Sequence, residues 1–283
     1  MDIKYISTRY LDSPPFISHG NGVRCVGIGF NFVCCGDRQG NLRLCRNKTK
    51  NELIKIKAHK EEVLSMDVRG TLVATASRDG TVNLYNVNDE IEKLASLNEH
   101  TGTVTSVKFL FSERTSPPCL QIISCGADKN LVFRTLVVKK GLVAPEDMSE
   151  ASLLKAAMHM DFSSSVEVQV NSLVTSKTPL FDLEADSSGK HVLVACQDAC
   201  VRVYNVSSGK HSKTLRNVSN NSGANLGTII KVAVDPSGYF VATASTDKTI
   251  TIFDYYKGDV VDTLVSGRAG TVCLCYQKSL LNR

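Results

Sequence analysis

The chain is organised by a hydrophobic pattern that occurs five times, with apolar side chains at the first, fourth and sixth positions of a short segment. A second apolar segment ending in small residues follows each copy, and then come a polar turn and a third apolar segment. Short apolar segments separated by turn residues predict β-strands that pair with their neighbours along the chain. The copies of the first segment are Val23/Val26/Ile28, Val63/Met66/Val68, Val104/Val107/Phe109, Leu180/Leu183/Ala185 and Ile229/Val232/Val234.

The polar turns give this repeat its period. Counted between their middle residues, consecutive turns are 40, 49, 70 and 49 residues apart. A repeat of about 40–50 residues built from strands alone is typical of β-propeller blades, and longer intervals accommodate inserted loops. We therefore predict an all-β propeller with five recognisable blades and a partial sixth. The turns are Arg38-Gln39-Gly40, Arg78-Asp79-Gly80, Ala127-Asp128-Lys129, Gln197-Asp198-Ala199 and Thr246-Asp247-Lys248.

The repeat divides the 283 residues into units. We expect blades near 19–57, 58–98, 99–175, 176–226 and 227–267, a partial blade at 268–276 and a tail at 277–283. Residues 1–18 are an N-terminal extension or a strand of a neighbouring blade. Residues 139–165 interrupt the third blade as a polar surface insertion, in which Glu146–Met160 could form a short helix.

The second repeat is the clearest template for one blade. Its expected strands are Val63–Val68, Leu72–Ser77, Val82–Tyr85 and a more polar outer strand at Lys93–Leu97. A sixth blade that starts at Thr271–Tyr276 leaves an unpaired edge. Either Lys4–Arg9 pairs there to close a ring, or the chain is a fragment of a longer propeller, which we favour because propellers usually close with whole blades.

Composition narrows the class of protein. The net charge is only +5, and no run of Lys and Arg is interleaved with aromatic residues, which argues against a nucleic-acid partner. No apolar run approaches the roughly 20 residues that span a bilayer, so we expect no membrane partner. The ten cysteines show no disulfide framework, and the N-terminus lacks the apolar core of a signal peptide. These features favour the reducing cytoplasm or nucleus.

Motifs of catalysis are missing from the sequence. There is no glycine-rich phosphate loop and no G-x-S-x-G elbow. Cys196 and Cys200 flank a turn without a nearby histidine, which is weak support for a zinc site. We therefore expect a protein that is not an enzyme and that needs no cofactor.

Longer runs outside the turns carry a resemblance to a known family. The chain resembles the mitogen-activated protein kinase-binding protein family of WD-repeat proteins, over about residues 20–275 and in order. The runs are Gly36–Leu44 (GDRQGNLRL), Ala74–Asp79 (ATASRD), Cys125–Thr135 (CGADKNLVFRT), Lys177–Lys210 and Gly227–Asp259.

The resemblance implies a function. Members of that family are large scaffolds with two propellers and a long disordered tail, and this chain resembles the second propeller. They bind Jun N-terminal kinase and upstream kinases and localise to the cytoplasm, centrosomes and spindle poles. The resemblance therefore implies a scaffold with kinases and centrosomal or spindle proteins as partners, although the family's kinase docking segment lies in the tail, which this chain does not match. The alternative is a generic WD-repeat adaptor, such as a ubiquitin-ligase substrate receptor.

The resemblance to WD-repeat proteins also implies a buried network in each blade. In those propellers a histidine before the first strand, a hydroxyl on the second, the turn aspartate and a tryptophan on the third strand are joined by hydrogen bonds. The chain has no tryptophan, and that position reads Cys45, Tyr85, Arg134, Tyr204 and Phe253. Gln39 replaces the first aspartate, and Ser176 and Asn225 stand at two histidine positions. The expected members are His59, Ser77, Asp79, Tyr85, His100, Asp128, Asp198, Ser245 and Asp247.

The turns also suggest a binding surface. Arg38, Arg78, Lys129 and Lys248 would lie on the propeller face where the turns meet. Such a basic rim could attract acidic or phosphorylated peptides. The alternative is a set of solvated loops without a ligand, because turn residues are commonly charged.

Overall fold

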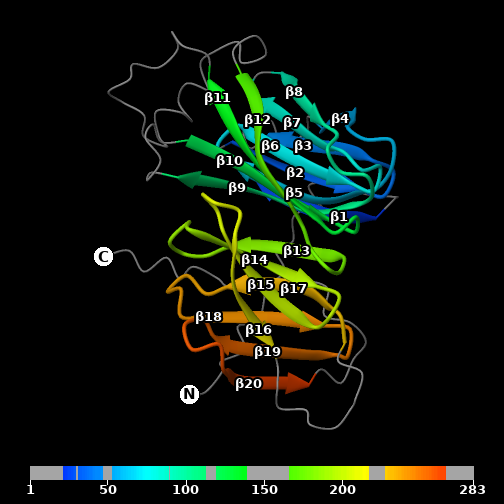
Figure 1. Ribbon diagram of the computed structural model, residues 1–283. Helices are drawn as coiled ribbons and strands as arrows, with labels where there is room; N and C mark the ends of the chain where they lie inside the picture. Colours follow the sequence, from blue (N-terminus) through cyan, green and yellow to red (C-terminus); the bar gives the residue numbers. More distant parts are fainter. Residues whose placement is uncertain are drawn as a thin grey trace, which may run out of the picture.

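A computed structural model describes residues 22–29, 31–46, 53–88, 90–112, 119–138, 166–216 and 227–265. In these ranges the regular elements are all β-strands, and they form five four-stranded antiparallel sheets (Figure 1). The predicted all-β propeller with five blades is thereby confirmed. The possible helix at Glu146–Met160, the segment Lys4–Arg9 and the partial blade at Thr271–Tyr276 lie outside the described residues, as do 1–18 and 277–283.

Each sheet is a meander of consecutive strands. The first blade contains β1 (Val23–Ile28), β2 (Phe32–Asp37), β3 (Asn41–Arg46) and β4 (Leu53–Lys57). The second contains β5 (Val63–Arg69), β6 (Leu72–Ser77), β7 (Val82–Val87) and β8 (Ile91–Leu97). The third contains β9 (Val104–Ser112), β10 (Cys119–Gly126), β11 (Asn130–Val138) and β12 (Val166–Thr175). The fourth contains β13 (Leu180–Ala185), β14 (His191–Cys196), β15 (Cys200–Asn205) and β16 (His211–Arg216). The fifth contains β17 (Ile229–Val234), β18 (Phe240–Ser245), β19 (Thr249–Asp254) and β20 (Val260–Val265).

The first strand of each blade is the innermost strand. Strand β5 contacts β1 on one side and β9 on the other, and β13 contacts β9 and β17 in the same way. The blades therefore follow one another in chain order around an inner row of first strands. The strands predicted for the second repeat are confirmed, with β5 one residue longer and β7 and β8 each two residues longer than expected.

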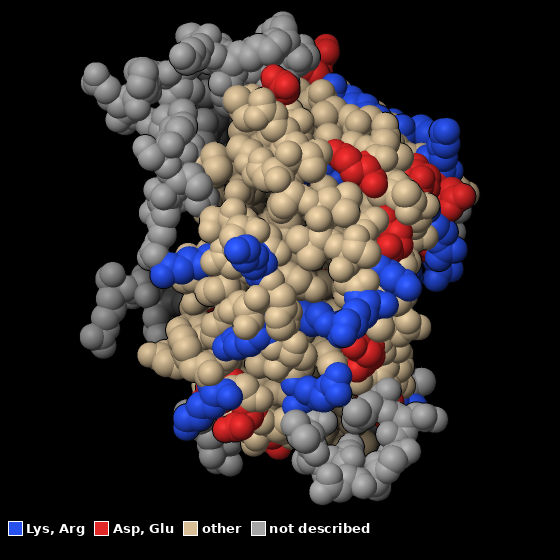
Figure 2. Space-filling model, viewed as in Figure 1, with Lys and Arg blue, Asp and Glu red and all other residues tan. Residues whose placement is uncertain are grey.

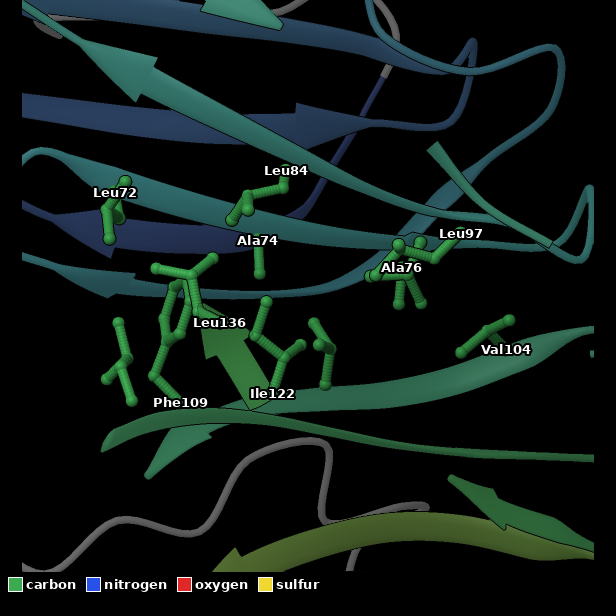
Figure 3. Packing of buried hydrophobic residues seen from close by; sticks show 12 residues of the cluster. Leu72, Ala74, Ala76, Leu84, Leu97, Val104, Phe109, Ile122 and Leu136 are labelled. Atoms are coloured by element: carbon green, nitrogen blue, oxygen red, sulfur yellow. The ribbon is translucent and has the colours of Figure 1, made fainter. Parts of the chain in front are cut away.

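The hydrophobic core lies between the blades. In β6, Val73 packs towards the first blade, whereas Leu72, Ala74 and Ala76 pack towards the third blade. All six residues of β6 are therefore buried, because neither set of alternating side chains faces water. Figure 3 shows this interface, where Leu84 and the β6 residues meet Phe109, Ile122 and Leu136. Burying each Leu or Phe contributes about 1.5–3 kcal/mol.

The first strand of the chain has different surroundings from its equivalents. Val26 and Ile28 of β1 are 60% and 75% exposed, whereas Met66 of β5 is buried against the first blade. The apolar side chains of a first strand pack on the preceding blade, and the described residues include no blade before β1. The pattern therefore predicted the strand correctly but not its burial.

Candidate interaction face formed by the blade turns

One backbone hydrogen bond fixes the turn between the second and third strands in every blade. The N–H of the first turn residue donates to the carbonyl of the residue just before the first strand. Together these turns and the loops before the first strands form a surface that we call the turn face. The pairs are Arg38 to Gly22 (3.3 Å), Arg78 to Glu62 (3.0 Å), Ala127 to Thr103 (2.9 Å), Gln197 to Pro179 (3.0 Å) and Thr246 to Thr228 (2.9 Å).

Turns also join neighbouring blades. The Gly40 carbonyl accepts hydrogen bonds from the N–H groups of Ala58 (3.0 Å) and His59 (2.9 Å). Gly40 has a φ of +78°, and a Cβ there would lie 2.4 Å from the carbonyl oxygens of Glu61 and His59. Only glycine fits this position, because the backbone of the second blade occupies the space of a side chain. The first turn is therefore locked against the second blade.

The last position of every turn has left-handed backbone geometry. It is glycine in the first two blades and Lys129, Ala199 and Lys248 in the others, with φ values of 70°, 57° and 70°. A left-handed conformation costs a residue with a Cβ roughly 1–2 kcal/mol. The three later turns therefore carry backbone strain that the first two avoid.

The structure brings His59 and Asp79 together in the second blade. The His59 side chain is fully buried, and its Nδ1 lies 3.3 Å from both carboxylate oxygens of Asp79. Asp79 also accepts hydrogen bonds from the N–H groups of Lys60 (2.8 Å) and Thr81 (3.0 Å) and from the Thr81 hydroxyl (2.7 Å). This carboxylate thus ties the turn to the loop before the first strand.

Two hydroxyls contact His59, that of Thr75 at Nε2 and that of Thr81 at Nδ1 (2.9 Å), so the prediction of Ser77 is wrong. Thr75 Oγ1 lies 2.8 Å from His59 Nε2. Ser77 Oγ instead donates to the Glu61 carbonyl (3.3 Å) and accepts from the Asp79 N–H (3.1 Å). Residues two apart lie on the same face of a strand, so alternation could not distinguish them, and only the depth of the imidazole ring selects Thr75.

Tyr85 occupies the tryptophan position of the second blade. Its hydroxyl donates to the Ala58 carbonyl, 3.2 Å away, beside His59. The side chain is 2% exposed, and burial raises the pKa of Tyr85 to about 12. Tyr85 therefore stays protonated and fastens the backbone next to the histidine.

The third blade contains a longer chain of hydrogen bonds. Arg134 Nη1 donates to Ser124 Oγ (2.8 Å), Ser124 Oγ lies 2.8 Å from His100 Nε2, and His100 Nδ1 lies 3.0 Å from Asp128. The Asp128 carboxylate can only accept, so Nδ1 carries the ring N–H that donates to it, and Nε2 of the neutral ring accepts from the Ser124 hydroxyl. Arg134, at the tryptophan position, is fully buried and also contacts Glu99.

The other predicted members bond to groups other than a histidine ring. Asp198 accepts from Thr178 Oγ1 (3.3 Å) and pairs with the Arg202 guanidinium. Asp247 accepts from the Thr249 N–H at 2.9 Å. Ser245 Oγ accepts from the Asp247 N–H at 3.4 Å, which is the role of Ser77 in the second blade. Asn225, expected at a histidine position, lies outside the described residues.

Asp37 replaces the missing turn aspartate of the first blade. It is fully buried, two residues before Gln39, and accepts from the N–H groups of Gln39 and Asn41 at 2.9 Å each. The Asn41 side chain donates to the other carboxylate oxygen at 2.8 Å. Burial alone would raise the pKa of Asp37, but these hydrogen bonds and Arg43 outweigh it and lower the pKa. The turn pattern did not predict this residue, because Asp37 precedes the turn and is not at its middle position.

Both buried histidines are neutral at pH 7. Burial lowers the pKa of His59 and of His100 below the ordinary 6.5, and the neighbouring carboxylates oppose this effect only in part. Burial would raise the pKa values of Asp79 and Asp128, but hydrogen bonds and the histidine rings more than offset it and lower them. Each pair is therefore a neutral imidazole donating to a carboxylate, not an ion pair.

The four basic residues predicted on the rim do not form one group. Arg38 and Arg78 both approach Glu62, with Nε of Arg38 at 3.8 Å and Nη2 of Arg78 at 3.0 Å. Lys129 and Lys248 lie on the turns of the third and fifth blades. Arg24 and Lys60, which the turn pattern did not predict, join Arg38 and Arg78 in lining the same hollow. Arg24 lies at the start of β1 and Lys60 in the loop before β5, and these positions next to the turns were the signal that could have identified them.

The charge distribution limits the kinds of ligand. In the view of Figure 2, lysine and arginine side chains form separate groups, several beside acidic residues, instead of a continuous stripe. Across the described ranges no group of three or more His, Cys, Asp or Glu side chains could hold a metal ion. No helix in the described part of the chain is long and apolar enough to cross a membrane.

The architecture and the turn networks define the class of protein as a WD-repeat propeller. The family model of the "WD domain, G-beta repeat" matches residues 50–86, 91–133 and 213–254. The chain therefore contains WD repeats.

Particular relatives cover most of the chain. It is 36% identical over 92% of its length to WD repeat-containing protein 62 of Sus scrofa. It is 33% and 32% identical over 75% of its length to mitogen-activated protein kinase-binding protein 1 of Mus musculus and of Homo sapiens. The chain spans 15% of the first relative and 12% of the other two.

Proposed function

We propose that this chain is a non-catalytic scaffold whose turn face binds protein kinases of the mitogen-activated cascade in the cytoplasm and proteins of centrosomes or spindle poles. The observation that carries the proposal is the similarity, over three quarters of the chain, to proteins named for binding a mitogen-activated protein kinase. A propeller suits this role, because its blades hold loops from distant parts of the sequence on one rigid face.

The chemistry of the described side chains supports a role without catalysis. His59 and His100 have fully buried side chains, and both ring nitrogens of each are engaged by neighbouring side chains. Neither ring has a nitrogen available for proton transfer with a substrate. Burial raises the pKa values of Cys25 and Cys34 to about 12, so these thiols are not nucleophilic thiolates at pH 7.

Affinity capture from cell lysate tests the proposal. The chain is immobilised beside two matched variants, Lys129→Glu/Lys248→Glu on the turn face and Lys210→Glu/Lys257→Glu in the loops between third and fourth strands. All four lysines are exposed. We expect the wild type and the second variant to retain a kinase of the mitogen-activated cascade, and the turn-face variant to lose at least fivefold. Recovery of no kinase above the bead control, or equal recovery with all three proteins, would overturn the proposal.

A further inference from the structure

A hollow on the turn face is lined entirely by charged residues. It has a volume of about 600 Å³ and lies where the first blade meets the second, beside the contact of β1 with β5 (Figure 1). Its lining comes from four segments: the start of β1, the turns of the first and second blades, and the loop before β5. The lining residues are Arg24, Arg38, Lys60, Glu61, Glu62 and Arg78.

Glu62 draws the arginines together without neutralising them. Its carboxylate lies 2.8 Å from Nε of Arg24 and 3.0 Å from Nη2 of Arg78. The Glu62 side chain is only 13% exposed, whereas those of Arg38 and Arg78 are 67% and 57% exposed. Each guanidinium carries five N–H donors, so donors remain for a ligand after the contacts with one carboxylate. Four cations face two carboxylates in the lining, which leaves two positive charges.

The wider surroundings do not cancel this charge. Asp79, next to Arg78, accepts from the Lys60 N–H and approaches His59, and its side chain is 8% exposed. A carboxylate already engaged in this way has little capacity left to pair with the exposed arginines. The excess positive charge therefore faces water.

The arginines at the first turn position occur only in the first two of the five blades. The first turn position is arginine there and an uncharged residue in the others, where it reads Ala127, Gln197 and Thr246. The backbone hydrogen bond of this position is the same in all five blades. Turn geometry therefore does not require arginine, and the pair Arg38 and Arg78 is not the ordinary composition of a turn in this chain.

We propose that this hollow binds the phosphorylated side chain of a partner protein. A phosphate monoester carries close to two negative charges at pH 7 and has three acceptor oxygens, which matches the residual charge and the donors of the guanidinium groups. No apolar or aromatic side chain lines the hollow, so it offers no surface on which a nucleobase would stack. This inference rests on the proposed function, because it names the class of partner segment that the turn face selects.

Fluorescence anisotropy with the full chain tests the site directly. The probe is a labelled pool of nonapeptides with central phosphoserine and degenerate flanks, and matched pools carry serine or glutamate at the centre. We expect the phosphoserine pool to bind at least tenfold more tightly than either other pool. Arg38→Ala/Arg78→Ala should weaken this binding at least tenfold, and Lys210→Ala/Lys257→Ala should leave it unchanged.

A second variant separates binding from folding. Glu62→Gln removes a competing negative charge, and we expect it to bind the phosphoserine pool about threefold more tightly, a gain that unfolding cannot produce. If the Glu62 and arginine variants both bind the pool like the wild type, the inference is wrong. Equal binding of the glutamate pool would also overturn it, as would inorganic phosphate that competes at the same concentration as the peptides.

The outcome is distinguishable from that of the proposed function. One outcome is that the affinity capture recovers kinases while neither phosphatase treatment of the lysate nor Arg38→Ala/Arg78→Ala changes which proteins are captured. That result would support the scaffold function and contradict the phosphate site. If no kinase is captured, the proposed function is wrong, whether or not the phosphoserine pool binds.

Discussion

Arg134, at the position where WD repeats place tryptophan, forms a bidentate ion pair with Glu99. Arg134 Nε and Nη2 donate to the two oxygens of Glu99 at 3.1 and 2.9 Å. The Arg134 side chain is fully buried and that of Glu99 is 27% exposed. In the third blade Arg134 thus supplies the N–H that donates to Ser124, and the partly exposed Glu99 carboxylate balances its charge.

Replacing Arg134 should destabilise the fold by an amount that depends on whether the new side chain can donate to Ser124. Arg134→Leu leaves Ser124 and Glu99 without their donor, and we expect a loss of about 3 kcal/mol in the free energy of unfolding. Arg134→Trp should lose less, because an indole N–H can donate to Ser124. Urea denaturation of the three proteins measures both values. A leucine variant as stable as the wild type would show that the pair contributes nothing.

The carboxylates that accept from the turn amides should contribute more to the stability of the fold than the neighbouring turn residues. Asp79→Ala leaves the amides of Lys60 and Thr81 without an acceptor, and we expect a cost of about 2–3 kcal/mol. Asp37→Ala should have a similar cost in the first blade, since this carboxylate accepts from the amides of Gln39 and Asn41. Gln39→Ala, on an exposed turn residue, is the control and should cost much less. Thermal melting ranks the three, and equal small shifts would contradict a structural role for the carboxylates.

Glycine should relieve the strain in the later turns. Ala199→Gly and Lys248→Gly each place glycine at a left-handed position, with φ values of 57° and 70°. We expect each to stabilise the fold by about 0.5–1 kcal/mol, because the steric cost of the Cβ exceeds the added entropy of the unfolded chain. Gly80→Ala, at a φ of +84°, is the reverse experiment and should destabilise. Glycine variants less stable than the wild type would refute the assignment of strain.

Acid should weaken the fold through the buried histidines. Their pKa values lie below 6.5 in the folded chain, so the unfolded chain takes up protons first as the pH falls. The stability due to the neutral rings is complete above about pH 6.5 and is lost as the pH falls towards the folded pKa values. The lowered pKa values of Asp79 and Asp128 add a further loss below about pH 3.8.

Comparing unfolding at pH 7.5 and 5.5 measures the histidine contribution. We expect the wild type to lose free energy of unfolding between these values, and His100→Gln to lose less because one titrating ring is gone. The slope with pH is the readout, since the variant is less stable at both values. Equal slopes in the two proteins would show that His100 does not titrate differently on folding.

Local residue chemistry was sufficient to predict the strands and turns of this protein. Alternating apolar positions and a polar turn identify β5, β6 and the turn at Asp79 without reference to the rest of the chain. These features depend on neighbours within a few residues, which is why a repeat exposes them so clearly.

The partners of individual side chains depended on the tertiary structure. Thr75 and Ser77 share one face of β6, and only the position of the His59 ring, 16 residues before Thr75 in the chain, decides which hydroxyl it meets. Ser106 bonds to Asp182, 76 residues away and in the next blade, at 2.9 Å.

The same division holds for the candidate site. The sequence by itself determined an all-β propeller with basic residues on its turns, because period and turn chemistry are local properties. Only the tertiary structure brought Arg24, Arg38 and Arg78 around Glu62, while Lys129 and Lys248 lie on turns of other blades. The physical reason is that the packing of one blade on the next sets the distances between their loops, and no spacing along the chain encodes that packing.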